Sequence, residues 1–169
     1  MKLLLDLDGT IVQYNFPKLV KDFFGVDISP LVIYAYDLAD ILGVSKQMID
    51  LMFKEQVYGK ANFIDGSLEV LEEWESKGYE LAIFSNRVNY MGEFELAKWL
   101  IENKIPFSGI DCEGAGNYDY AIDDRPAKLA DVNASVKLLY HQQWNSRCYD
   151  IEKQLIRVKS WQKIKEIVG

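Results

Sequence analysis

The chain has 169 residues, 49% hydrophobic and 27% charged, which is the composition of one globular domain long enough to bury a core. Its net charge of −7 argues against a nucleic acid polymer or an anionic membrane as the main partner, because both require a basic surface. The sequence has no apolar run of bilayer length and no signal-peptide pattern, so we expect a cytoplasmic protein. Cys112 and Cys148 lack metal-site spacing and are expected to be reduced thiols.

The first predicted element is a strand over 2–8, followed by a helical insertion. The strand reads KLLLDLD, a short apolar run typical of a parallel strand that is buried on both faces. The segment 14–62 is much longer than an ordinary connection between a strand and a helix. Apolar residues recur in it at helical spacing, in three stripes: Leu19, Val20 and Phe23; Leu38, Ile41 and Leu42; Ile49, Met52 and Phe53. We therefore predict a small helical cap at about 14–62.

Strands and helices alternate after the insertion. Further strands are predicted at 80–86, 119–124 and 136–141. One helix, which Ser67 or Asp65 caps and Gly78 ends, precedes the second strand. Two more helices are marked by their apolar residues: Phe94, Ala97, Leu100 and Ile101, ending before Pro106; and Trp161, Ile164, Ile167 and Val168. This order predicts an α/β fold, a Rossmann-like doubly wound parallel sheet in a single domain 1–169 whose core is 1–13 and 63–169.

Polar residues end three of the predicted strands. They are Asp6 and Asp8, then Ser85 and Asn86, then Asp123 and Asp124. Because the carboxyl ends of parallel strands share one edge of a sheet, we expect these side chains to form a single site. Four carboxylates there would repel one another without a cation, and a hard ion such as Mg²⁺ prefers oxygen ligands. Each motif alone could be a turn or a helix cap, but the three together favour a site.

These motifs carry a resemblance to a known family. Asp6-Leu7-Asp8-Gly9-Thr10, Ser85 after LAIF, and Asp123-Asp124 after YAI resemble the first, second and fourth motifs of the haloacid dehalogenase superfamily. The helical insertion after the first motif also matches that superfamily. Within it, the chain is most similar to the 5′(3′)-deoxyribonucleotidase-like branch. The segments that resemble this branch are FIDG…LEEW (63–74), YAIDDRP (120–126), QWN (143–145) and RVKSW (157–161).

The resemblance implies a phosphohydrolase mechanism and a role for each motif residue. Asp6 would be the nucleophile that forms an aspartyl-phosphate, and Asp8 would be the general acid and base. Mg²⁺ would be held by the Asp6 carboxylate, the Asp8 backbone carbonyl and Asp123, Asp124 or both. Ser85, with nearby backbone N–H groups, would hydrogen-bond the phosphate oxygens, and Asn86 is a further candidate for phosphate binding.

The chain departs from the family in its third motif, which is a lysine that pairs with the nucleophile and the phosphate. No basic residue lies between Lys104 and Asp123. Losing this cation should weaken phosphate binding and raise the pKa of Asp6. The preferred replacement is Lys98, which follows Ser85 at about the spacing of a second phosphate-facing lysine in the branch. The other candidates are Lys104, Arg87 and Lys128, and each of the four could instead be an ordinary solvated side chain.

The remaining conspicuous residues are assigned mainly to packing. The lone His141 ends a strand and is not needed by this mechanism, and Trp144 and Trp161 are predicted to be packing residues. The aromatic residues of the insertion should pack its small core, with one or two free to stack on a base, Tyr14 and Phe16 above all. The others are Phe23, Phe24, Tyr34 and Tyr36.

The sequence therefore predicts a Mg²⁺-dependent phosphatase of small phosphate monoesters, with a nucleoside or deoxynucleoside monophosphate as the favoured substrate. Two alternatives stay open. One is a phosphatase of another small metabolite, because the fold does not choose a substrate. The other is a phosphate- or nucleotide-binding protein with little turnover, suggested by the missing lysine. The oligomeric state also stays open, a homodimer included.

Overall fold

The structure of the chain is a computed structural model that describes residues 1–28, 38–56, 59, 61–146 and 154–169. Tyr34, Tyr36 and Cys148 lie outside the described residues. Across the described part of the chain, no helix has the length and apolar character needed to cross a membrane.

The described residues form one parallel sheet of six strands, in the order β3-β2-β1-β4-β5-β6. The strands are β1 (Lys2–Leu5), β2 (Glu80–Ile83), β3 (Gly109–Ile110), β4 (Asn117–Asp123), β5 (Asn133–Tyr140) and β6 (Ile156–Val158). In the central strand β1, Leu5 is in register with Ile83 of β2 and Ile122 of β4. The predicted α/β class and parallel sheet are confirmed. The sequence missed β3 and β6, because both are too short to show a pattern.

Helices cover both faces of the sheet, and alternate residues of β1 belong to two different cores. Leu3 and Leu5 pack with residues of α4 (Ser67–Ser76), α5 (Val88–Glu102) and α7 (Trp161–Val168). Leu4 packs on the other face with Leu129 of α6 (Pro126–Asp131). β1 is buried on both sides, which explains why its sequence is uniformly apolar.

Two helices differ from the sequence prediction. At the start of α4 the capping position is Gly66, with φ +76°, and Ser67 does not cap: its hydroxyl donates to the carbonyl of Ile11 at 2.9 Å. Helix α5 begins earlier than predicted and is kinked at Gly92 (φ 80°, ψ 161°). The predicted apolar stripe of this helix is only partly buried: Phe94 and Ile101 are 80% and 67% exposed, because the face that meets the core is made by Leu96, Trp99 and Leu100.

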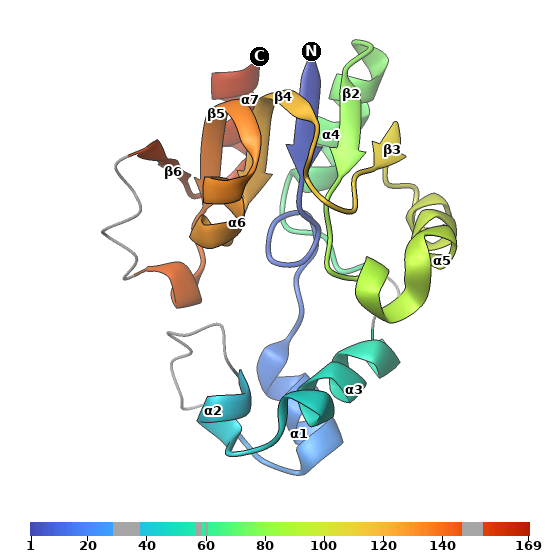
Figure 1. The fold of residues 1–169 in the computed structure, drawn as a ribbon, viewed down its shortest axis with the longest axis vertical. Helices are drawn as coiled ribbons and strands as arrows, with labels where there is room; N and C mark the ends of the chain where they lie inside the picture. The colour runs from blue at the N-terminus through green and yellow to red at the C-terminus, as the bar shows by residue number, and fades with distance from the viewer. Residues whose placement is uncertain (29–37, 57–58, 60, 147–153) are drawn as a thin grey trace.

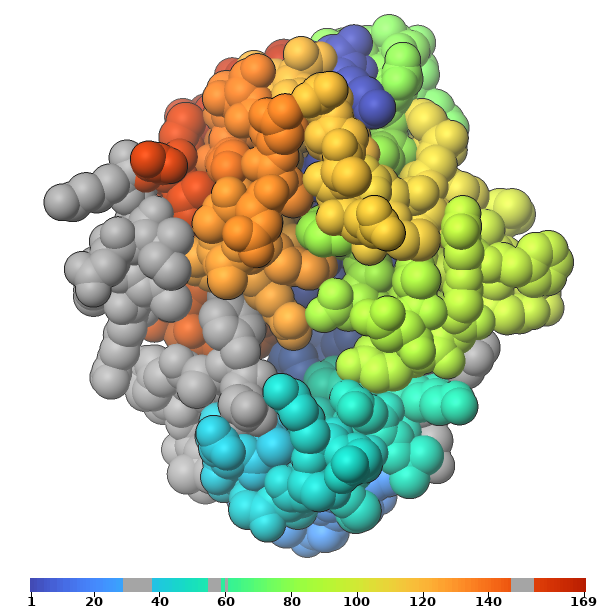
Figure 2. All heavy atoms as spheres, viewed as in Figure 1, coloured from blue at the N-terminus to red at the C-terminus, as the bar shows by residue number. Residues whose placement is uncertain are grey.

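Three helices form a separate unit below the carboxyl edge of the sheet (Figure 1). They are α1 (Phe16–Phe24), α2 (Leu38–Leu42) and α3 (Lys46–Gln56), and we call them the helical unit. Asn15 caps α1 by accepting from the backbone N–H of Lys18 at 3.1 Å, and Gly25 ends it in the left-handed conformation. The unit has its own core: Leu19, Val20, Ile28, Leu38, Ala39, Ile49 and Met52. Figure 2 shows this lobe beneath the lobe that contains the sheet.

Candidate active site

A tight loop after β1 carries the first acidic motif. The backbone N–H of Asp6 donates to the carbonyl of Ile122 at 3.0 Å, which extends the pairing of β1 with β4 by one step. The chain then turns so that the carbonyl of Leu7 accepts from Ile11 and Val12, each at 2.9 Å. Gly9 lies in this turn with φ +87°, and a Cβ atom there would lie 2.6 Å from Oδ2 of Asp124. The loop therefore requires glycine both for its backbone conformation and for its close approach to Asp124.

Three buried carboxylates meet where β1 and β4 end. Asp6, Asp123 and Asp124 are at most 6% exposed, and each contributes a carboxylate oxygen to a group lying within 4.8 Å. We call them the carboxylate cluster. Lys128, on the first turns of α6, reaches into it: its Nζ lies 3.1 Å from Oδ1 of Asp6 and 3.6 Å from Oδ2 of Asp123.

The electrostatics of the cluster favour protonation of its members. Burial raises the pKa of Asp6, with a contribution from the nearby Asp8, while Lys128 opposes the rise. Burial and the charge of Asp6 raise the pKa of Asp123 well above its usual value and that of Asp124 to about 7. Burial lowers the pKa of Lys128, but its acidic neighbours outweigh this effect and the net shift is upward. One lysine therefore offsets only part of the negative charge.

The second acid of the motif faces a different neighbour. Asp8 accepts two hydrogen bonds from Nε of Arg87, at 3.0 and 3.1 Å, and one from Nη2 at 2.8 Å. Arg87 is 2% exposed, and its guanidinium lies 4.0 Å from the centre of the Trp99 ring. Its Nη2 also donates to the hydroxyl of Tyr14. This bidentate, stacked geometry fixes the Asp8 carboxylate firmly.

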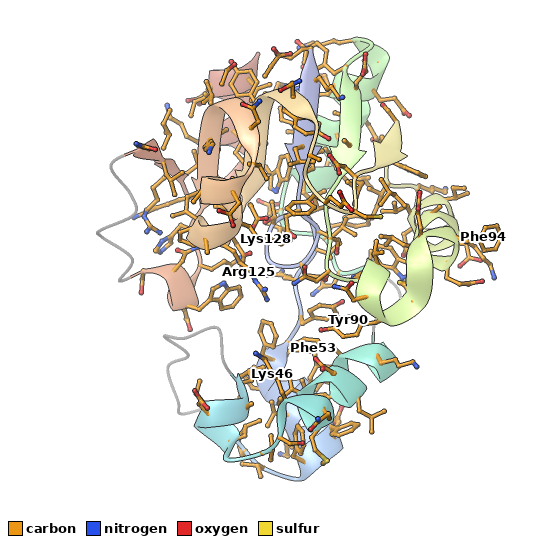
Figure 3. All side chains as sticks on the ribbon, in the orientation of Figure 1. Lys46, Phe53, Tyr90, Phe94, Arg125 and Lys128 are labelled. Carbon is orange, nitrogen blue, oxygen red and sulfur yellow. The ribbon has the colours of Figure 1, made fainter. Side chains whose placement is uncertain are left out.

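A cavity of about 440 Å³ lies between these carboxylates and the helical unit (Figures 2 and 3). Helix α3 contributes Lys46, Ile49, Asp50 and Phe53, the i, i+3, i+4, i+7 face of one helix. In Figure 3, Lys46 and Phe53 of the helical unit lie opposite Arg125 and Lys128 of the sheet-bearing part, with Tyr90 beside them. The other lining residues are Asp6, Asp8, Tyr14, Phe16, Leu38, Asn86, Arg87, Asp124 and Trp144.

Aromatic rings form one wall of this cavity. The rings of Tyr14, Phe16 and Phe53 contact one another pairwise, with centroids 6.1 to 6.2 Å apart. The fourth ring, Trp144, meets Phe16 edge-on at 5.4 Å. The cavity therefore has an acidic, hydrogen-bonding end at the sheet and an aromatic end at the helical unit. A ligand with one anionic and one flat apolar part fits this polarity.

Comparison with known proteins identifies the architecture. No protein-family model matches the chain. A relative described as "Putative nucleotidase", from Halalkalibacterium halodurans, is 27% identical over 114 residues, which is 65% of this chain but only 57% of that protein. The chain thus spans little more than half the length of this relative.

Two solved structures match along almost the whole chain. A haloacid dehalogenase-like family hydrolase from Streptococcus pneumoniae matches with a TM-score of 0.60 and 17% identity, over 98% of this chain and 97% of that one. The D,D-heptose 1,7-bisphosphate phosphatase of B. bronchiseptica, solved with magnesium and phosphate, matches with a TM-score of 0.52 and 10% identity, over 99% and 98%. The chain has the fold of the haloacid dehalogenase superfamily. At these identities the likeness concerns the fold, so the chemistry must be argued from the residues.

The haloacid dehalogenase-like fold brings most of the predicted residues to one edge, though not to one group. Asp6, Asp123 and Asp124 lie together, whereas Asp8 pairs with Arg87. Asn86 lines the cavity. Ser85 is buried at the end of β2, where its hydroxyl accepts from the backbone N–H of Arg87 at 3.2 Å, and it is not among the lining residues.

The cation beside Asp6 is Lys128 and not the lysine preferred from the sequence. The side chain of Lys98 is 56% exposed, pairs with Glu95 at 3.9 Å and does not line the cavity. Arg87 is in the site but is paired with Asp8. The sequence signal that would have found Lys128 is its position four residues after Asp124. A helix that starts at Pro126 turns this position back toward the strand end.

The carboxylate cluster fits a divalent cation. Its donors are carboxylate oxygens, which hard cations such as Mg²⁺ and Ca²⁺ prefer. Burial raises the pKa values of all three acids, and the charge of Asp6 raises those of Asp123 and Asp124 further; a cation would offset these charges. The residues that would hold it are Asp6, Asp123 and Asp124.

Sequence analysis missed a second layer of contacts beneath this site. Trp144, predicted to be a packing residue, lines the cavity and donates from its indole Nε1 to Oδ2 of Asp124 at 2.5 Å. Asn145 donates from its side chain to the carbonyl of Asp124 at 2.8 Å. Nothing in the spacing of residues 142–145 indicates these contacts, because they depend on the tertiary position of a short 3₁₀ turn. His141 contacts Arg157 at 3.0 Å and does not line the cavity.

Proposed function

We propose that the protein is a phosphatase that hydrolyses small phosphate monoesters through an aspartyl-phosphate on Asp6, with Mg²⁺ as cofactor. The observation that carries the proposal is the carboxylate cluster, in which Lys128 contacts Asp6 and Asp123, beside a cavity at the carboxyl edge of a haloacid dehalogenase-like sheet. The solved phosphatase with magnesium and phosphate supports the choice of metal and of reaction class.

In this mechanism the Asp6 carboxylate attacks phosphorus, and the bond to the leaving oxygen breaks. Asp8 gives a proton to that oxygen and later takes one from the water that hydrolyses the aspartyl-phosphate. Asp6 is well held for attack, because Lys128 contacts its Oδ1 and the hydroxyl of Thr10 donates to its Oδ2 at 3.2 Å. The ammonium of Lys128 would also attract the phosphoryl oxygens.

Mg²⁺, when bound, would polarise the phosphoryl group as a Lewis acid and offset the charge of the cluster. The protein itself supplies position and charge. Arg87 keeps the Asp8 carboxylate in one orientation beside the nucleophile. The helical unit would serve as the cap that closes over the substrate.

We propose a nucleoside monophosphate as the substrate class, in line with the deoxyribonucleotidase-like branch. The aromatic wall formed by Tyr14, Phe16 and Phe53 offers faces and edges to a flat base. Lys46 and Asp50, on one face of α3, offer a donor and an acceptor to the polar edge of that base. The volume of about 440 Å³ is suitable for a ligand of this size. The relative described as a nucleotidase supports the same choice.

The test is phosphate release from a panel of 5′- and 3′-nucleoside monophosphates and sugar phosphates, with Mg²⁺ or with EDTA. Wild type should release phosphate from nucleotides only with the metal present. Asp6→Asn should lose at least ~10³-fold in rate, because the nucleophile is removed while the fold remains.

Each alternative gives a distinct result in this assay. Faster phosphate release from sugar phosphates than from nucleotides would show that the substrate is another metabolite, and the proposed reaction through Asp6 would be retained. No release from any ester with Mg²⁺ present, together with measurable nucleotide binding, would replace the enzyme with a nucleotide-binding protein.

A further inference from the structure

A short segment after β5 supports both acidic motifs from below. It consists of residues 142–145 and includes the 3₁₀ turn Gln143–Asn145. The side chain of Gln142 donates to the carbonyl of Gly9 at 2.7 Å, and that of Asn145 donates to the carbonyls of Asp124 and Tyr140 at 2.8 and 2.7 Å. The segment therefore fixes the backbone of the first motif and that of the fourth motif relative to each other.

The segment is itself anchored, so that it can act as a fixed support. Asn145 is fully buried, and its side-chain oxygen accepts from Nη1 of Arg157 at 2.6 Å. A second bond runs from Nη2 of Arg157 to the backbone carbonyl of Asn145 at 2.9 Å. Buried side chains that are held by several hydrogen bonds keep one rotamer. This anchoring extends to the neighbouring Trp144.

Among the hydrogen bonds of the described residues, Trp144 alone joins a side chain of this segment to a carboxylate of the cluster. Its indole Nε1 donates to Oδ2 of Asp124 at 2.5 Å. The backbone of Gly9 lies close beside this contact, because a Cβ there would be 2.6 Å from Oδ2 of Asp124 and 3.1 Å from Cζ2 of Trp144. The indole and the Gly9 backbone thus restrict the orientation of the Asp124 carboxylate.

The indole ring also contacts the helical unit. It meets the ring of Phe16 edge-on, with centroids 5.4 Å apart, and packs against the core of that unit. The N–H group and the ring therefore face two different parts of the molecule. A substitution that keeps an aromatic ring but removes the N–H group separates the two contacts.

We propose that Trp144 is a positioning residue for the cation site, which orients the Asp124 carboxylate through its indole N–H group. An indole N–H can only donate, so it binds the Oδ2 atom of Asp124. Fixing Oδ2 in this way also fixes the position of Oδ1, the other oxygen of the carboxylate. Partners behind a metal ligand orient it, and their removal lowers metal affinity by typically ~10–100-fold. The inference rests on the proposed function only in that it needs a divalent cation at the carboxylate cluster.

The test is Mn²⁺ binding, measured by electron paramagnetic resonance without substrate, in wild type, Trp144→Phe and Phe16→Leu. Trp144→Phe should raise the dissociation constant by ~10–100-fold while the thermal midpoint stays near that of wild type. Phe16→Leu removes the ring partner in the helical unit and should bind Mn²⁺ as wild type does. Phosphate release by Trp144→Phe should recover at saturating metal, because the loss lies in cation affinity.

A second measurement uses the unsubstituted protein in case Trp144→Phe folds poorly. The chain has four tryptophans, so the indole N–H resonances in a ¹⁵N correlation spectrum can be followed during a Mg²⁺ titration. The resonance of Trp144 should shift with the cation, whereas that of Trp74, which packs in the main core, should move little.

Three outcomes would overturn the inference. They are a wild-type Mn²⁺ affinity in Trp144→Phe, a loss of Mn²⁺ affinity in Phe16→Leu as large as that in Trp144→Phe, and a Trp144 resonance that does not shift when Mg²⁺ is added. If wild type itself binds neither cation, the metal-dependent function fails as well. Cation binding by wild type together with an unaffected Trp144→Phe would remove only the role of Trp144.

Discussion

The two aspartates of the first motif lie two residues apart on one loop, yet their surroundings differ. Asp6 is buried among two further carboxylates and one lysine, so the fully ionised group has two more negative than positive charges. Asp8 is 31% exposed and faces one buried arginine, so that pair is neutral. The first group is electrostatically incomplete without a further cation, and the second is complete as it stands. Two aspartates of one loop can thus differ in charge balance, because different side chains face them: Lys128 beside Asp6 and Arg87 beside Asp8.

The largest expected effect comes from the one cation of the incomplete group. Lys128→Met should lower kcat/KM for phosphate release by ~10²–10³-fold, because the ammonium that contacts Asp6 and Asp123 is lost. Lys98→Met removes an exposed lysine of α5 and should retain the wild-type rate. Steady-state kinetics at saturating Mg²⁺ measures both. If Lys98→Met is slow and Lys128→Met has the wild-type rate, the cation that assists Asp6 is Lys98, as the sequence favoured.

The complete group should show its pairing in stability. Arg87→Met leaves Asp8 without its bidentate partner and should cost about 2 kcal/mol in urea unfolding at pH 7, less than for a fully buried pair because Asp8 is partly exposed. The double variant Arg87→Met with Asp8→Asn should regain part of this loss, because no charge is then left unpaired. A double variant as unstable as Arg87→Met alone would mean that packing of Arg87 on Trp99 matters more than the charge pair.

The incomplete group should make the metal-free protein sensitive to pH. Since the pKa of Asp124 is raised to about 7 in the folded protein, its ionisation opposes folding. This contribution is favourable in acid and is lost as pH rises from about 4 through about 7. In EDTA, Asp124→Asn should therefore be more stable than wild type at pH 8, by on the order of 2 kcal/mol, and the gain should vanish at pH 4. Thermal unfolding across this range checks the sign, and Mg²⁺ should restore wild type at pH 8.

The smallest effect concerns the contact between the helical unit and the sheet-bearing part. The hydroxyl of Tyr90 on α5 donates to Asp50 of α3 at 3.2 Å, in an exposed position. Tyr90→Phe should cost about 0.5 kcal/mol and raise KM modestly, because the cavity lies between these two helices. Tyr79→Phe is the matched control, since it removes a hydroxyl bond to the Gly169 carbonyl, outside the cavity, and should leave KM unchanged.

The main strands of the fold were predictable because β1, β2, β4 and β5 are short apolar runs with polar ends. The helical stripes of the insertion were also predictable, since residues such as Leu19 and Val20 pack in the separate core of the helical unit. The kink at Gly92 was not, because a glycine inside a helical pattern can also continue the helix. Phe94 and Ile101 were misassigned because helical spacing identifies the helix but does not show which of its apolar residues face the core, and here Leu96, Trp99 and Leu100 do.

The polar strand ends were visible in the sequence, whereas their partners were not. Lys128 contacts Asp6 from the start of helix α6, and Arg87 contacts Asp8 from the turn after β2. Both contacts depend on the direction in which the backbone leaves a strand, which the sequence does not show. Trp144 is separated from Asp124 by the whole of β5 and by α6, and no local pattern joins them. Residues at strand ends can thus be placed from the sequence, whereas the side chains that face them depend on the tertiary structure.

The central place of β1 in the sheet has a consequence for synthesis of the protein. Its two neighbours are β2, which begins at Glu80, and β4, which begins at Asn117. A growing chain therefore carries Asp6 and Asp8 long before Asp123 and Asp124 exist, and for most of translation one edge of β1 has no partner. Until β4 leaves the ribosome this apolar edge is open to pairing with other chains, so the nascent protein should depend on chaperones during that interval. The carboxylate cluster can then form only in a late step, when β4 pairs with β1.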